Sequence, residues 1–237
     1  MSTVAIDGGL SRAPGLVTAF YESLVGKKAV MAVTGFILFG YVLVHMLANL
    51  QIFLPTPAGG TPALDRYALQ LRVFPPVLWG ARVVLLAAVV LHIIAAVQLS
   101  WLNKLESRTT RYVKYTPQAS SYASRTMWWS GPIIFFYVIY HLLDLTFGRW
   151  NPNFEEGHVR HNVIASFQNP WVAGFYVVAN VLLAIHLYHG VWSMCQTVGI
   201  SHPRYTPILK TASAIFAVAI GVGFCAVPIA VLAGIVT

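Results

Sequence analysis

Charged side chains are scarce in this sequence, where Asp, Glu, Lys and Arg together make up 9% of the 237 residues. A soluble globular domain carries about 25% charged residues, so this chain has too few of them to cover a surface that faces water. The scarcity excludes an ordinary soluble enzyme, a disordered chain and a nucleic-acid-binding protein. The formal net charge is +8, from 15 basic and 7 acidic side chains. The positions of these few charges are more informative than their sum.

Cysteine is almost absent as well. Cys195 and Cys225 are the only two, and both lie in apolar runs. We therefore expect them to be small packing residues, which excludes a disulfide scaffold or a cysteine-rich metal cluster. The first 28 residues hold no apolar segment followed by a small-residue cleavage site, so we expect no signal peptide.

What the sequence does contain is long apolar segments. Five of them reach the roughly 20 residues that a helix needs to cross a bilayer, namely 29–54, 79–101, 127–148, 170–195 and 208–235. We predict an all-α integral membrane protein with a five-helix transmembrane domain over 29–237. Residues 1–28 form an N-terminal segment, in which Leu16 to Leu24 is either a helix along the membrane interface or a mobile tail.

Basic residues are divided unequally between the two ends of the predicted bundle. Ten of the 15 fall on the side of the N-terminus, five of them in the loop near 102–126. The positive-inside rule therefore predicts a cytoplasmic N-terminus and a C-terminus outside. We call the predicted cytoplasmic end the inner end and the opposite end the outer end. At the outer end we expect an irregular turn at the start of 55–78 and a short surface helix within 149–169.

Five of the eight histidines lie inside the predicted spans, which hold His45, His92, His141, His186 and His189. An ionisable side chain inside a membrane is a functional candidate. At 1.5 Å per residue, His45 and His141 lie roughly 24 and 21 Å from the inner end, whereas His92 and His186 lie roughly 10 and 8 Å from it. The depths predict two pairs: an outer pair, His45 and His141, and an inner pair, His92 and His186.

Two histidines at one depth on facing helices are typical of the axial ligands of a haem iron. The two pairs therefore predict two b-type haems. The sequence has no C-x-x-C-H motif, so these haems would not be attached covalently. The alternative is that the histidines form hydrogen bonds between helices; a closed zinc site would need about four ligands. His189 could replace His186 as a ligand, or donate to a haem propionate or a quinone.

Charged groups near the two pairs have two interpretations each. Asp144 follows His141 by three residues and is either an acid that reaches the membrane surface, paired with Arg82, or a proton acceptor for a quinol at the outer haem. Near the inner pair, Lys27, Lys28 and Arg125 are candidate cations for haem propionates or a quinone. Each could equally be a positive-inside anchor. Three alanines lie one turn from His92 and would leave clearance for a flat macrocycle or serve helix packing, namely Ala88, Ala95 and Ala96.

Ordered motifs run from Ser23 to about Pro207. They are SLVGKK at 23–28, MAVTG at 31–35, His45 with Asn49 and Leu50, His92, SRTM at 124–127, Tyr140 with His141, HLYHGVWS at 186–193 and QTVG at 196–199. In this order the chain resembles the cytochrome b subunit of succinate:quinone oxidoreductase and fumarate reductase, of the single-polypeptide, five-helix, two-haem type.

The resemblance implies particular ligand pairs. In such proteins the first histidine pairs with the third and the second with the fourth, which agrees with the pairing obtained from depth. Many relatives carry Asn three residues after the fourth histidine, where this chain has His189, so the resemblance implies His186 as the ligand. Relatives can also carry an acid at the position of Asp144.

The resemblance also implies partners and a location. A flavoprotein with covalent FAD would oxidise succinate, and an iron–sulfur subunit would dock on the cytoplasmic face and exchange electrons with this chain. The chain has no Rossmann glycine pattern and no cysteine cluster, so it would itself bind two haems, lipid and a quinone, usually menaquinone. It would act as the quinone-reactive anchor subunit of a succinate dehydrogenase in the bacterial cytoplasmic membrane.

Two other functions are compatible with part of these observations. Anchors of formate dehydrogenase, nitrate reductase and hydrogenase are also cytochromes b with histidines on a few helices. A cofactor-free transporter would show internal repeats and helices broken at mid-membrane, neither of which is evident here.

Overall fold

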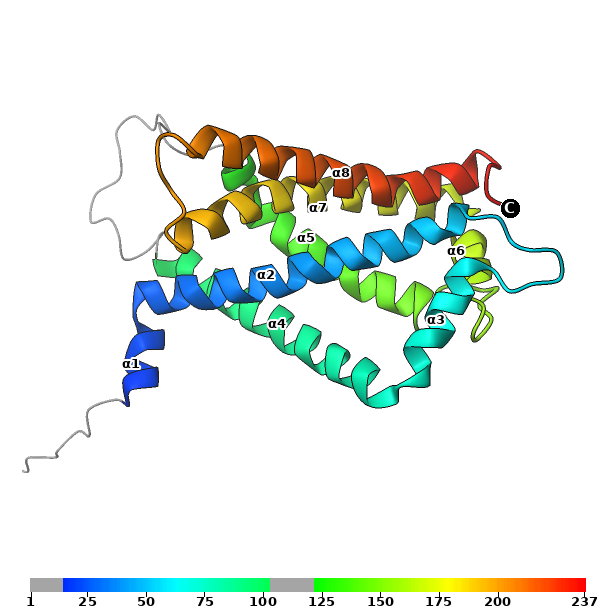
Figure 1. Cartoon of the computed structure of the whole chain (residues 1–237), viewed down its shortest axis with the longest axis horizontal. Coiled ribbons are helices and arrows are strands. Elements are labelled where there is room, and N and C mark those ends of the chain that lie inside the picture. Colours follow the sequence, from blue (N-terminus) through cyan, green and yellow to red (C-terminus); the bar gives the residue numbers. More distant parts are fainter. Residues whose placement is uncertain (1–14, 103–121) are drawn as a thin grey trace, which may run out of the picture.

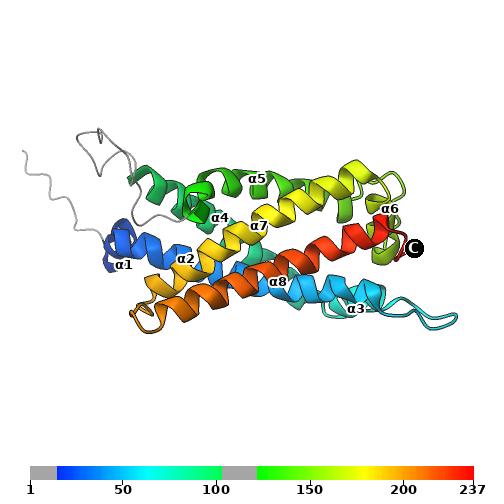
Figure 2. The ribbon, with the colours of Figure 1, turned by 90° about the horizontal axis from the view of Figure 1, so that it is seen from above.

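The computed structural model describes residues 15–102 and 122–237, and of residues 122–125 only the backbone. In these residues five long helices lie side by side (Figures 1 and 2). They are α2 (Leu24–Asn49), α4 (Pro75–Trp101), α5 (Tyr122–Leu145), α7 (Pro170–Thr197) and α8 (Thr206–Leu232). Each holds an apolar stretch long enough to cross a membrane. The prediction of an all-α membrane bundle with five spanning helices is confirmed. Most of the loop near 102–126 lies outside the described residues.

The helix starts follow local sequence signals. α4 begins at Pro75 and α7 at Pro170, and proline is favoured in the first turn of a helix because its missing N–H has no partner to lose there. The predicted span began four residues later than α4, at Trp79, because it followed the apolar run rather than the proline. α7 is also capped by Asn169, whose side chain accepts a hydrogen bond from the backbone N–H of Trp171 at 3.0 Å.

The helices do not pack on one another equally. α7 and α8 share the most extensive interface, α2 packs on α4, α7 and α8, and α5 packs on α7. Many large apolar side chains on α4 and α5 are exposed, including Trp79 and Trp129. Exposed apolar faces of this extent are expected where lipid covers the helices.

The outer end of the bundle carries a compact cap. It consists of the 3₁₀ turn η1 (Leu50–Phe53), α3 (Ala63–Val73) and α6 (Val159–Phe167). The buried carboxylate of Asp65 in α3 accepts a hydrogen bond from the backbone N–H of Arg160 in α6 at 2.7 Å. The expected short helix within 149–169 is present as α6, and the expected irregular turn at the start of 55–78 precedes α3. α3 itself was not expected.

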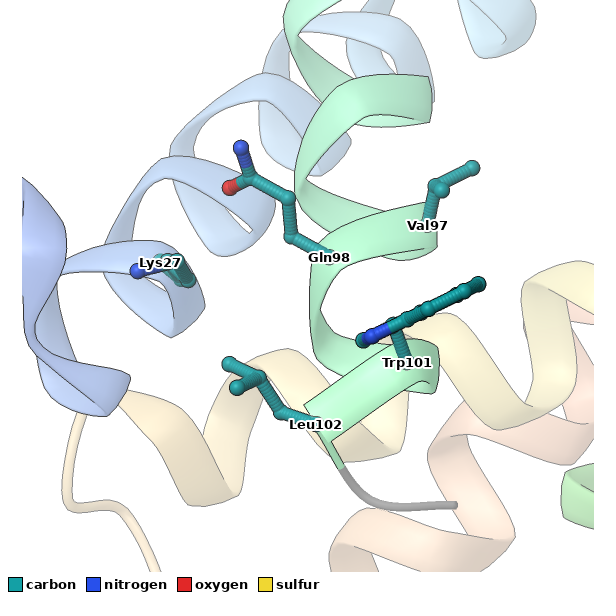
Figure 3. Close-up of a pocket in the computed structure, with 5 residues that line it drawn as sticks. All are labelled: Lys27, Val97, Gln98, Trp101 and Leu102. Atoms are coloured by element: carbon teal, nitrogen blue, oxygen red, sulfur yellow. The ribbon is translucent and has the colours of Figure 1, made fainter. Parts of the chain in front are cut away.

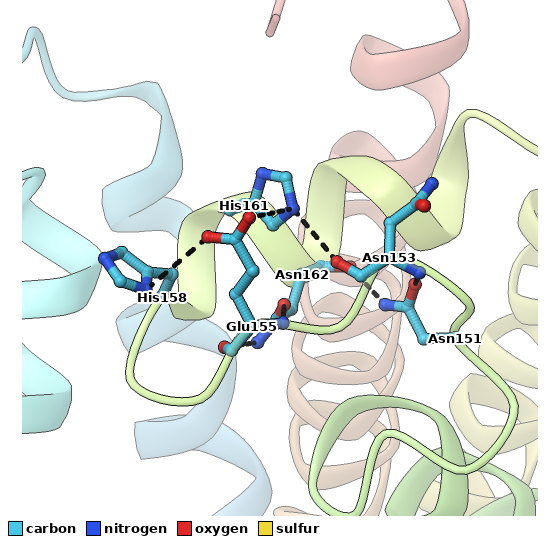
Figure 4. Close-up of polar contacts among 6 residues, drawn as sticks. All are labelled: Asn151, Asn153, Glu155, His158, His161 and Asn162. Carbon is cyan, nitrogen blue, oxygen red and sulfur yellow. Dashed lines mark hydrogen bonds and ion pairs between the residues drawn. The ribbon is translucent and has the colours of Figure 1, made fainter.

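The loop before α6 is held by an asparagine network (Figure 4). The Asn162 side chain accepts from the Glu155 N–H and donates to the Glu155 carbonyl, both at 2.7 Å. Asn151 donates to the Asn162 carbonyl at 2.9 Å. His158 and His161 are exposed beside the Glu155 carboxylate. His158 precedes α6, and His161 lies in its first turn.

The inner end carries one short helix, α1 (Leu16–Glu22), which turns away from the axis of α2 (Figure 1). Ser23 is the residue at the bend between α1 and α2. Its hydroxyl accepts from the Gly26 N–H at 2.9 Å and donates to the Phe20 carbonyl at 2.6 Å. Tyr21 donates to the Gln98 side chain of α4 at 2.9 Å, which fastens α1 to the bundle. Residues 16–22 are therefore helical, and the position of this helix along the membrane interface stays a prediction.

Candidate functional site

The outer pair of histidines joins α2 and α5. The ring centres of His45 and His141 lie 5.8 Å apart, with the ring planes at 81°. Tyr41, one turn before His45 on α2, stacks on the His45 ring with centres 5.3 Å apart and planes at 12°. The structure thus brings together two side chains that are 96 residues apart in the sequence.

The inner pair joins α4 and α7. The ring centres of His92 and His186 lie 6.4 Å apart, with the planes at 57°. A hydroxyl stands beside each ring: Thr34 Oγ1 lies 3.1 Å from His92 Nδ1, and Ser130 Oγ lies 3.4 Å from His186 Nδ1. The ring that faces His92 is that of His186. His189 is half-buried on the same helix, one turn further toward the inner end.

Both pairs extend between helices that are not in close backbone contact. Within the described chain, α2 packs on α4 and α7 but not closely on α5, and α4 packs on α2 and α3 but not closely on α7. The two imidazoles of each pair therefore approach each other between separated helices. All four histidines are only partly buried by the described protein.

The spacing of the rings fits a shared iron. A metal lies about 2 Å from a ligating imidazole nitrogen, and that nitrogen about 1 Å from its ring centre, so two imidazoles on opposite sides of one iron have centres about 6 Å apart. The observed separations of 5.8 and 6.4 Å are close to this value. His, Cys, Asp and Glu side chains of the described residues form no group of three or more that could hold a metal ion. Pairs are sufficient for a haem, because the porphyrin supplies the other four nitrogens.

Hydrogen bonds at two of the histidines also fit iron ligation. The Thr34 hydroxyl has one proton, which it donates to the Val30 carbonyl at 2.7 Å, so it can only accept from His92. His92 must then carry its proton on Nδ1 and leave the Nε2 lone pair free. The same reasoning applies to His141, because Tyr176 donates its proton to Asp144 at 2.8 Å and lies 3.5 Å from His141 Nδ1. An Nδ1–H that is held this way leaves Nε2 for a metal.

Asp144 is completely enclosed by the outer end of the bundle. Its side chain is 1% exposed, and one carboxylate oxygen accepts from Ser166 of α6 at 2.7 Å and from Tyr176 of α7 at 2.8 Å. Arg82 instead lies over the Trp79 ring at 4.8 Å and is exposed. The interpretation of Asp144 as a surface-reaching acid paired with Arg82 is therefore wrong. These two hydroxyls join the buried carboxylate of Asp144 to α6 and α7.

The structure does not place the other predicted site residues, all of them basic, beside a histidine pair. The ammonium of Lys27 donates to two backbone carbonyls at the end of α1, those of Tyr21 at 3.3 Å and Glu22 at 2.6 Å. Lys28 is exposed. The side chain of Arg125 lies outside the described residues. Their role toward propionates or a quinone stays a prediction.

Small residues beside His92 turn out to serve packing. Ala88 and Ala95 are buried in α4, the helix that packs closely on α2. Their burial supports the helix-packing interpretation, because small residues allow α2 and α4 to approach closely. Clearance for a macrocycle stays a prediction.

Three residues around the histidines were missed from the sequence: Thr34, Ser130 and Tyr176. The available signal was weak, because a single hydroxyl in an apolar helix is most often bonded to its own backbone. Thr34 does so and contacts His92 in addition. Only the relative rotation of neighbouring helices, which the sequence does not specify, shows which hydroxyl faces which histidine.

Comparison with known protein families identifies a family. A family model described as succinate dehydrogenase/fumarate reductase transmembrane subunit matches residues 103–225, just over half of the chain. The matched part includes His141, Asp144, Tyr176 and His186. Neither a curated protein nor a solved structure matches the chain.

Proposed function

Because the chain belongs to the succinate dehydrogenase/fumarate reductase transmembrane-subunit family, we propose that it carries electrons between an iron–sulfur subunit and a membrane quinone through two b haems. Membership makes it an integral membrane subunit of an oxidoreductase complex that also contains a flavoprotein and an iron–sulfur subunit. The presence of two haems, the use of a quinone and the direction of electron transfer are part of our proposal.

The observation that carries the proposal is the presence of two imidazole pairs with ring centres 5.8 and 6.4 Å apart. In this assignment His45 and His141 hold the outer haem, and His92 and His186 hold the inner haem. A bound b haem supplies a one-electron carrier that cycles between ferric and ferrous iron. Two such sites at different depths make a path for electrons across the bundle.

The side chains around the histidines have distinct tasks in this proposal. Thr34 and Tyr176 fix which nitrogen of His92 and His141 carries the proton and how each ring is turned. Asp144 is the proton acceptor at the outer end, because it is the carboxylate to which Ser166 and Tyr176 donate. A proton released by a quinol would reach it through one of these hydroxyls, since the carboxylate itself is covered.

The finer assignment rests on the sequence resemblance. We propose that the complex is a succinate:menaquinone oxidoreductase of the bacterial cytoplasmic membrane, with the inner end facing the iron–sulfur subunit. The dicarboxylate chemistry takes place on the flavoprotein. Lys28 and Arg125, together with Lys27, supply positive charge at the inner end, where haem propionates would be anionic neighbours.

The test is succinate-dependent reduction of haem in membranes that contain the whole complex. Addition of succinate is expected to produce the α-band of a reduced b-type cytochrome, and His92→Ala is expected to abolish the inner-haem part of it. His202→Ala, which changes an exposed loop histidine, is the control and keeps the full band. A complex that oxidises succinate and reduces quinone without any b-type band would overturn the proposal.

A further inference from the structure

His45 differs from the other proposed haem ligands in how its ring is held. A hydroxyl lies beside Nδ1 in each of the other three, namely His92, His141 and His186. Within the part of the chain that the structure describes, no hydrogen bond reaches the His45 ring, and Asn49 donates to the backbone carbonyl of His45 instead, at 3.0 Å. Packing must therefore set the position of this ring.

Two aromatic side chains lie beside the His45 ring. Tyr41 stacks on it from the same helix, so Tyr41 turns together with His45 and cannot fix the rotation of α2. Phe224 comes from α8, and its ring centre lies 5.9 Å from that of His45 with the planes at 44°. Of the five spanning helices, α8 is the one without a histidine, yet it provides this contact.

Gly223 of α8 leaves room for the side chain that follows His45 on α2. A Cβ atom at Gly223 would lie 2.9 Å from Met46 Cγ and closer still to Met46 Sδ, nearer than side-chain atoms pack. Met46 is 7% exposed and belongs to a core cluster that includes Leu187 of α7 and Ile220 of α8. Because protein interiors are close-packed, Met46 has little room to move aside. The missing side chain at Gly223 therefore allows α2 to approach α8 at the level of His45.

The other neighbours of α2 contact it further from the outer pair. α4 contacts the inner half of α2, where His92 lies beside Thr34 and where Lys27 and Gln98 line one pocket (Figure 3). Toward the outer end α2 and α4 diverge (Figure 1). α5, which carries His141, does not pack closely on α2 within the described chain. Near the outer pair, the rotation of α2 therefore depends on the side of this helix that faces α7 and α8.

We infer that Gly223 and Met46 are positioning residues for the outer pair. Met46, packed against Gly223, sets the rotation of α2 and with it the 81° angle between the imidazole planes of His45 and His141. The inference rests on the proposed function, because it takes these two rings as the ligands of one haem. It gives α8, which carries no ligand, the task of holding a ligand helix in place.

The test is electron paramagnetic resonance of the ferric complex in membranes. The low-spin signal of a ferric haem with two imidazole ligands depends on the angle between the imidazole planes, so the signal reports how His45 is turned. Gly223→Ala is expected to shift the outer-haem signal and to leave the inner-haem signal unchanged, since the inner pair joins α4 and α7. His45→Ala, which should lack the outer haem, identifies the outer-haem signal.

Two further variants separate the Met46 contact from general effects. Gly223→Ala combined with Met46→Ala removes the side chain that the new methyl group would contact too closely, so the outer-haem signal should return to its wild-type position. Gly80→Ala adds the same methyl group and the same gain in helix propensity to α4, where the new Cβ meets no atom within 4 Å. Both signals should stay unchanged in this control.

Met46→Val tests the same contact without added bulk. The shorter side chain no longer reaches Gly223, so α2 is held less firmly and the outer-haem signal should broaden. An unchanged outer-haem signal in Gly223→Ala or in Met46→Val, equal shifts at both haems, or a shift that the double variant keeps would each overturn the inference and leave the proposed function intact. Wild-type protein without a haem at the outer pair would contradict the proposed function, and the inference with it.

Discussion

The inner and outer histidine pairs, which we propose as haem ligands, have the same side-chain chemistry but differ in the groups that contact them. Behind the inner pair are the neutral hydroxyls of Thr34 and Ser130. Behind the outer pair is Tyr176, which is bonded to the buried carboxylate of Asp144. A group that forms a hydrogen bond with the ring nitrogen that does not bind the metal tunes the basicity of a ligating histidine and the properties of its metal. The same two-histidine site is therefore placed in two different electrostatic surroundings.

The difference follows from the ends of the bundle at which the pairs lie. The outer pair lies under α3 and α6, and α6 supplies Ser166, one of the two hydroxyls that satisfy Asp144. A buried carboxylate needs such partners, because an unpaired one costs several kcal/mol. Around the inner pair the described structure has no comparable cap, and the nearby polar groups are hydroxyls on the helices themselves. The cap thus allows an acid close to one pair only.

The largest expected effect separates the two candidate ligands of the inner pair. His186→Ala should remove the inner haem, because the ring that faces His92 at 6.4 Å is lost. His189→Ala, on the same helix one turn away, should keep both haems. The pyridine haemochrome assay gives the haem-to-protein ratio, expected to be one for the first variant and two for the second. The reverse result would make His189 the ligand and break the proposed inner pair.

The next effect concerns the carboxylate behind the outer pair. Asp144→Asn removes an acceptor of negative character that favours ferric iron, so the midpoint potential of the outer haem should rise. The expected rise is on the order of 80 mV, since hydrogen bonds to charged groups contribute about 1.5–3 kcal/mol and 59 mV corresponds to about 1.4 kcal/mol for one electron. The inner haem should stay within measurement error.

Asp65→Asn is the matched control for this variant. Asp65 is also buried at the outer end, but it bonds the backbone of Arg160 in the cap rather than a group next to a histidine. Optical redox titration of both variants is the measurement. Equal shifts in the two variants would mean that the cap as a whole, not the Asp144 contact, sets the potential.

A smaller shift of the outer-haem potential is expected when the hydroxyl between Asp144 and His141 is removed. Tyr176→Phe removes the hydroxyl that joins Asp144 to His141 but leaves the ring in place, so the outer potential should rise by about 40 mV, the equivalent of one ordinary hydrogen bond of about 1 kcal/mol. Tyr137→Phe is the control, because its hydroxyl contacts Asn180 at 3.4 Å instead. An unchanged potential in Tyr176→Phe, beside a shifted one in Asp144→Asn, would show that the acid acts without the tyrosine.

The smallest effect is expected at the inner pair. Thr34→Val removes the hydroxyl that accepts from His92 and should raise the inner potential alone, by about 20 mV, because a neutral hydroxyl contributes only about 0.5 kcal/mol. Thr34→Ser keeps the hydroxyl and should restore the original value. A shift at the outer haem in either variant would contradict the assignment of His92 to the inner pair.

The sequence predicted those features that depend on one helix at a time. Apolar length identified the five spanning helices, and the fixed rise per residue placed His45 at the depth of His141 and His92 at that of His186. Features that depend on how helices turn toward one another were missed. Asp144 looked able to reach the surface, but the rotation of α5 and the presence of α6 enclose it. α3 was missed because Asp65 and its polar neighbours interrupt the apolar pattern.

Haem content in three variants tests the central claim of two independent histidine pairs most directly. Wild-type protein is expected to contain two protohaems per chain. His45→Ala and His92→Ala should each contain one, and the double variant none, with all three variants still present in the membrane at the wild-type level. A single variant that keeps both haems, or one haem per chain in the wild-type protein, would contradict the assignment of one haem to each pair.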